Sequence, residues 1–191
     1  MLICLTSLLL LFIKKSFIEN ETAAFEFLQD RPEGAILQWI STLQFLSIPL
    51  IYAWKFTVIG FVLYTACFLY GYKISFSQCW GIALTSEFIF LIPETLKIIW
   101  FLTVKQDPTL YDIRAFYPLS LMHFFDYYSL DKKWAYPLKA LNVFEILYWW
   151  LLYLGLHQLI NRSRKIILYL VTSTYIPLFF LWLAYYLIVY K

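Results

Sequence analysis

Charged side chains inside apolar stretches are the residues of this sequence that could carry chemistry. An ionisable group within a membrane-like segment is costly and is a functional candidate by default. Carboxyls in such positions can pass protons or ions, and a nearby lysine can serve as their counter-charge. Two segments rich in apolar residues, 76–104 and 140–160, contain five such candidates, namely Glu87, Glu94, Lys97, Glu145 and His157.

The spacing of these residues allows a structural interpretation as well as a functional one. Glu87 and Glu94 are seven residues apart, which places them on one face of a helix. Glu94 and Lys97 are three residues apart, so their side chains can form a pair within the helix. The functional hypothesis is a proton or ion relay. The structural hypothesis, which we favour, is a neutralised Glu94–Lys97 pair and a glutamate that is protonated or bonds between helices and so fixes how the segments 76–104 and 140–160 pack.

No other motif supports a metal site or catalysis. His123 and Asp126 have a spacing that could hold a metal on a helix, but a zinc site needs three or four ligands. The three cysteines lie in apolar runs without paired spacing and are expected to be packing residues. Glycine-rich phosphate loops, GxSxG and HExxH are absent from the sequence. We therefore predict a protein that is not an enzyme and has no metal or cofactor.

The composition indicates that these candidates belong to a membrane protein. Hydrophobic residues make up 62% of the 191 residues, aromatic residues 22% and charged residues only 14%, whereas about 25% of a soluble domain is charged. Apolar surface on this scale must face lipid. The formal net charge of +3 is small and gives no reason to expect a nucleic-acid partner.

Hydrophobic stretches predict an all-α polytopic membrane protein with a single transmembrane domain, residues 1–191. A bilayer core requires about 20 helical residues, and the last stretch has 25 without a charge. Lys55 is expected to snorkel to the interface, and the third span to bend at Pro93. The five predicted spans are residues 2–18, 48–71, 76–104, 140–160 and 166–190.

One or two further helices are predicted to lie along the membrane surface. Residues 35–47 carry apolar side chains at helical spacing, with polar ones off that stripe, and Pro32 suits the first turn of this helix. The alternative is that this segment continues into the next span. Residues 118–128 are the second candidate, followed by a turn in water at residues 131–134. Lys and Arg lie on both predicted faces, so they do not decide the orientation.

The order of these segments resembles the Yip family of integral membrane proteins. In bacterial members a span ends in a glycine, a short basic turn follows, and Phe-x-Gln opens the next helix, as in Gly71-Tyr72-Lys73 and Phe76-Ser77-Gln78 here. Further similarity lies in residues 63–64, 92–93, 118–121, 141–149 and 154–156. The resemblance implies five helices, a cytoplasmic N-terminus and a cytoplasmic loop at residues 161–165.

This chain departs from the eukaryotic Yip proteins in two respects. It lacks their Asp-Leu-Tyr-Gly-Pro signature, and its first predicted span lies at its start. The resemblance therefore points to a prokaryotic cytoplasmic (inner) membrane rather than to vesicle traffic. The leading hypothesis is a scaffold or accessory subunit that binds other membrane proteins or itself. The alternative is a small transporter or proton-coupled permease that uses Glu87, Glu94 and Glu145.

Overall fold

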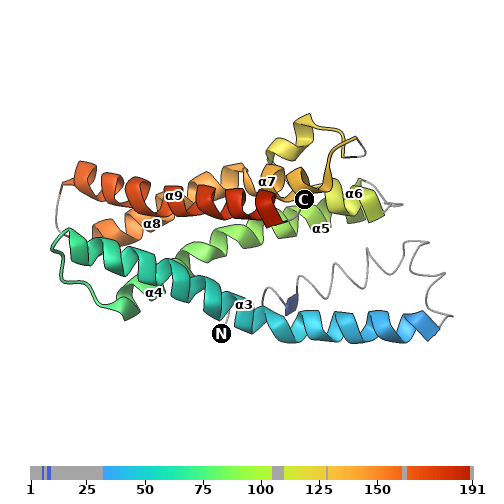
Figure 1. Cartoon of the computed structure of the whole chain (residues 1–191), viewed down its shortest axis with the longest axis horizontal. Helices are drawn as coiled ribbons and strands as arrows, with labels where there is room; N and C mark the ends of the chain where they lie inside the picture. The colour runs from blue at the N-terminus through green and yellow to red at the C-terminus, as the bar shows by residue number, and fades with distance from the viewer. Residues whose placement is uncertain are drawn as a thin grey trace. The chain divides into compact units, whose positions relative to one another are not determined.

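The computed structural model is built from helices (Figure 1). It describes residues 6, 8, 9, 32–104, 110–127, 129–160 and 163–189, so the predicted first span lies almost wholly outside the described residues. The regular elements of the described residues are helices, and one isolated bridge joins Ser120 to Asn142. The chain divides into two compact units, Met1–Ala53 with Phe90–Pro118 and Trp54–Ile89 with Leu119–Lys191.

Helix α3 is one continuous element, Pro32–Leu69, where two helices were expected. It begins at Pro32, as predicted, because proline lacks the N–H that a first turn leaves unbonded. The separate surface helix over residues 35–47 is wrong, and the alternative of a continuation into the next span is what the structure has. Pro49 lies inside α3, yet the helix runs through it. The part Ser47–Leu69 is long and apolar enough to cross a bilayer.

A tight turn reverses the chain after α3, as the sequence predicts. Gly71 has a φ of 76°, a left-handed conformation that suits glycine. The N–H of Gly71 bonds to the carbonyl of Phe68 and that of Tyr72 to Cys67, which satisfies the last carbonyls of the helix. Helix α4, Phe76–Ser86, then begins with a capping box between Ser75 and Gln78.

The predicted third span is interrupted. Helix α4 ends at Ser86, a 3-10 turn η2 covers Glu87–Phe90, and helix α5 covers Leu91–Thr103. Pro93 has no N–H to bond to the carbonyl four residues earlier, and its ring crowds that carbonyl. The irregularity thus lies one turn before the proline rather than at it.

The connection between α5 and the next long helix contains short helices. Helix α6 covers Leu110–Ala115, the 3-10 turn η3 covers Leu121–Phe124, and helix α7 covers Lys132–Ala140. The predicted helix over residues 118–128 is therefore only one 3-10 turn. The turn predicted at residues 131–134 is wrong, because α7 begins there.

Helices α8 (Val143–Leu159) and α9 (Arg164–Val189) pack side by side. Asn142 caps α8: its side-chain oxygen accepts the N–H of Glu145 at 2.8 Å. Helix α9 has 26 residues and is long and apolar enough to span a membrane, as predicted. Helix α8 has 17 residues, near the lower limit of about 17–25 for a span.

Each unit has its own packing centre. In the unit of Trp54–Ile89 with Leu119–Lys191, α8 contacts both α4 and α9, and α7 contacts α9. Its fully buried side chains include Leu63, Tyr148, Leu152, Leu156, Ile167 and Leu170. In the other unit, Ile98 and Phe101 of α5 pack on Ile113 of α6, and the rings of Trp100 and Phe116 stack at 5.5 Å.

A glycine sets how closely α4 approaches α8. A Cβ built on Gly155 would lie 2.7 Å from Cγ2 of Ile82 and 3.1 Å from its Cγ1. Real Cβ atoms do not come so close, and the branched Ile82 side chain has few rotamers with which to move away. Small residues in helix contacts serve this purpose widely in membrane proteins.

We expect Gly155→Ala to destabilise the protein by about 1–3 kcal/mol, the usual cost of overpacking. Gly81→Ala is the matched control, because nothing lies within 4 Å of a Cβ at that helical position; it should be neutral or stabilising by up to about 1 kcal/mol. Thermal unfolding in detergent measures both. Equal melting temperatures for the two variants would contradict the close contact.

Candidate functional site

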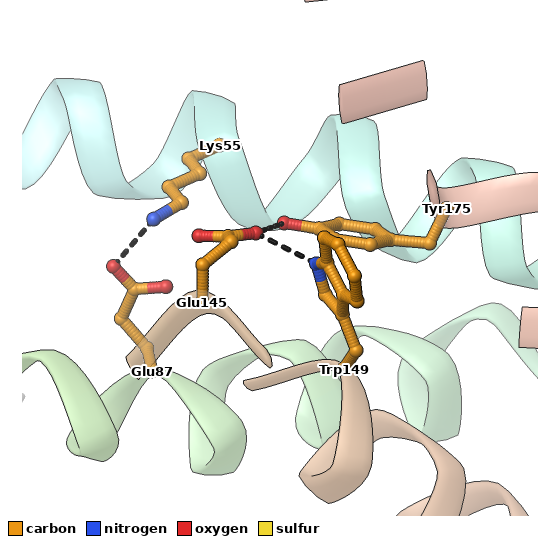
Figure 2. Close-up of polar contacts among 5 residues, drawn as sticks. All are labelled: Lys55, Glu87, Glu145, Trp149 and Tyr175. Atoms are coloured by element: carbon orange, nitrogen blue, oxygen red, sulfur yellow. Dashed lines mark hydrogen bonds and ion pairs between the residues drawn. The ribbon is translucent and has the colours of Figure 1, made fainter. Parts of the chain in front are cut away.

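A cluster of polar side chains lies among the apolar residues of the unit Trp54–Ile89 with Leu119–Lys191 (Figure 2). It includes two of the predicted carboxyls, Glu87 and Glu145, and both are buried. The cluster draws on four elements, α3, η2, α8 and α9. Its members are Lys55, Glu87, Glu145, Tyr148, Trp149 and Tyr175.

Lys55 and Glu87 form the ionic part of this cluster. The Nζ atom of Lys55 donates to Oε1 of Glu87 at 2.6 Å. The Glu87 side chain is only 4% exposed, whereas that of Lys55 is 37% exposed. A carboxylate so far from water needs a counter-charge, and the ammonium provides it. Lys55 thus bonds inward to η2, where snorkelling alone was expected.

The fold brings these two residues together through the turn at Gly71. Lys55 precedes Gly71 by sixteen residues, and Glu87 follows it by sixteen. In an antiparallel helix pair, residues equidistant from the turn lie opposite one another. Nearer the turn, Tyr64 lies seven residues before Gly71 and contacts Phe76, five residues after it, so the rule holds there only approximately. This symmetry is a signal in the sequence from which the Lys55–Glu87 pair could have been predicted.

Glu145 joins α8 to α9. Its Oε1 accepts the indole N–H of Trp149 at 2.9 Å and the hydroxyl of Tyr175 at 3.1 Å. Trp149 is one turn further along α8, and Tyr175 comes from the middle of α9. Glu145 thus bonds between helices, but it links α8 to α9, whereas a link between the segments 76–104 and 140–160 was expected.

Tyr148 of α8 is the aromatic residue that contacts both Tyr175 and Lys55 of the cluster. Its residue is fully buried, its ring lies 5.4 Å from that of Tyr175, and the Lys55 ammonium lies 5.8 Å from the ring centre. An ammonium at this distance over an aromatic face gains a cation–π attraction.

The structure does not bring Glu94 and Lys97 together as predicted. Lys97 is buried, and its Nζ donates to the backbone carbonyl of Ile113 at 2.6 Å. That carbonyl lies in the last turn of α6, where helix carbonyls lack partners within the helix and attract cations. No ion pair joins Glu94 and Lys97 among the described residues. Glu94 is half-buried.

The predicted histidine lies outside the polar cluster. His157 is half-buried, and its ring contacts that of Tyr153 at 5.8 Å. His123 and Asp126 have no third ligand: no three His, Cys, Asp or Glu side chains of the described residues lie together so that they could hold a metal.

Chemically, the cluster can do two things. Its hydrogen bonds across α3, η2, α8 and α9 can fix helix packing in a medium without water. Its two buried carboxyls can also exchange a proton. Comparison of the chain with models of known families, with curated proteins and with solved structures finds no match.

Proposed function

We propose that this protein is a non-enzymatic integral membrane protein with five spans that acts as a scaffold or accessory subunit of a larger membrane complex. The observation that carries the proposal is the use of the intramembrane carboxyls as links between helices. Glu145 bonds to Tyr175 of α9, and Glu87 bonds to Lys55 of α3. Buried polar groups that bond between helices in this way hold the helices in fixed positions.

The exposed surfaces of α3 and α9 are apolar and aromatic. Trp54, Phe61 and Phe68 follow one another at seven-residue intervals on α3, and each is at least 60% exposed. The exposed face of α9 carries Leu181, Tyr185 and Ile188. Such faces suit lipid and the helices of other membrane proteins.

The resemblance to the bacterial Yip family supports the same proposal and adds a direction. It places the N-terminus and the loop at residues 161–165 on the cytoplasmic side of a prokaryotic inner membrane. It also supports the count of five spans, with α4–η2–α5 as the third and α8 as the fourth. The alternative of a small transporter or proton-coupled permease draws on the proximity of Glu87 and Glu145 in one cluster.

The test is the state of the protein after extraction in a mild detergent. We expect the chain, expressed at its native level, to run in a complex much heavier than its own 22.9 kDa, with a fixed ratio to one or more membrane proteins or to itself. Light scattering gives the protein mass after correction for detergent. A monomer that drives proton-coupled flux in vesicles would contradict the scaffold and support the transporter.

A further inference from the structure

The polar cluster has one more negative charge than positive if both carboxyls are ionised. The described residues contribute one ammonium, Lys55, and two carboxyls, Glu87 and Glu145. Both glutamates are more than nine-tenths buried. An uncompensated charge in such a place is unfavourable, and buried acids respond by taking up a proton.

The acceptor atoms show where the proton belongs. Oε1 of Glu87 accepts the hydrogen bond from Lys55 Nζ. Oε2 of Glu87 is buried and has no hydrogen-bond donor among the described residues. Oε1 of Glu145 accepts hydrogen bonds from the Trp149 indole N–H and the Tyr175 hydroxyl. In Figure 2 the second oxygen of Glu145 points toward the side on which Lys55 and Glu87 lie.

We propose that Glu145 is protonated while Glu87 stays ionised beside Lys55, so that the cluster is a binding site for one proton. Lys55 and Glu87 remain an ion pair, so the ammonium compensates the one remaining negative charge. The carbonyl oxygen of Glu145 still accepts from Trp149 and Tyr175.

The other groups that face this site bring no further positive charge. From α9 comes the hydroxyl of Tyr175, and from α8 come Trp149 and the ring of Tyr148; all three are uncharged when protonated. From α3 comes Lys55, whose ammonium lies on Glu87. The Lys55 side chain is 37% exposed, so the cluster reaches the surface of this unit. This site goes beyond the scaffold role, because it makes the packing of these helices depend on pH.

Infrared difference spectroscopy of the purified full chain in lipid nanodiscs tests the proposal. A protonated buried carboxyl gives a separate C=O stretching band that shifts in D₂O. We expect this band at neutral pH in the natural protein, its loss in Glu145→Gln, and its retention in Glu94→Gln, the matched control. Adding sodium chloride should not change it.

Two further variants keep the proposal testable if Glu145→Gln does not fold. Glu87→Gln should weaken or remove the band, because the Lys55 ammonium then compensates the charge of an ionised Glu145. Lys55→Met should roughly double the band, because Glu87 then loses its counter-charge and takes up a proton too. An absent band, a band displaced by sodium, or one that none of these changes alters would overturn the proposal. So would a band lost in Glu87→Gln but kept in Glu145→Gln.

Discussion

Lys55→Met is expected to destabilise the folded protein by about 3 kcal/mol, the lower end of the usual cost of removing one partner from a buried ion pair. The substitution leaves Glu87, whose side chain is 4% exposed, without the ammonium at 2.6 Å. Methionine fills similar space, so little of the effect comes from packing. Glu87→Gln should cost less, because the 37%-exposed Lys55 side chain can turn toward the surface.

Lys133→Met is the matched control for Lys55→Met, and a double variant tests whether the loss of stability can be rescued. Lys133 forms a loose pair with Asp131 at 3.8 Å, and the Asp131 side chain is 76% exposed. Lys133→Met should therefore change stability by less than about 1 kcal/mol. The double variant Lys55→Met with Glu87→Met should recover much of the loss. Unfolding curves in detergent compare the four variants, and equal losses for Lys55→Met and Lys133→Met would contradict a buried pair.

Tyr148→Ala is expected to cost about 3–5 kcal/mol, as large aromatic-to-alanine changes in cores do. Tyr148 is fully buried between α8 and α9, so its removal leaves a cavity beside both carboxyls and takes the ring away from Lys55 and Tyr175. Tyr148→Phe keeps the ring and should cost much less.

Trp150, two residues further along the same helix, is the control for Tyr148. It is 53% exposed, so Trp150→Ala removes an aromatic ring from the surface rather than from the core. We expect a loss well below that of Tyr148→Ala. Folded yield after membrane extraction and melting temperature measure both. A greater loss for Trp150→Ala would indicate that this face, not the polar cluster, holds the fold together.

Local sequence signals predicted the elements whose ends are set by neighbouring residues. The turn at Gly71 and the start of α4 at Phe76 follow from a glycine in a left-handed conformation and a Ser–Gln capping box. The start of α3 at Pro32 follows from the missing N–H. The uncharged run that became α9 was equally plain.

What the sequence did not predict depends on contacts between distant segments. A three-residue spacing allowed a Glu94–Lys97 pair, but the carbonyl of Ile113, sixteen residues from Lys97, is the bonded acceptor. Helix α7 has two charged residues and a tryptophan at its start, which suggested a turn, whereas packing on α9 favours a helix. Trp149 lies one turn from Glu145 on α8, a spacing that the sequence shows, whereas Tyr175 reaches Glu145 only because α8 and α9 lie side by side.

Reporter fusions test most directly whether these helices cross a membrane. Tags that become active or are labelled on only one side of the membrane are placed after Lys73, Lys133, Ser163 and Lys191. Five spans predict that Lys73 and Ser163 report from the cytoplasm and that Lys133 and Lys191 report from the opposite side. The same side for Lys73 and Lys133, or for Ser163 and Lys191, would contradict the account.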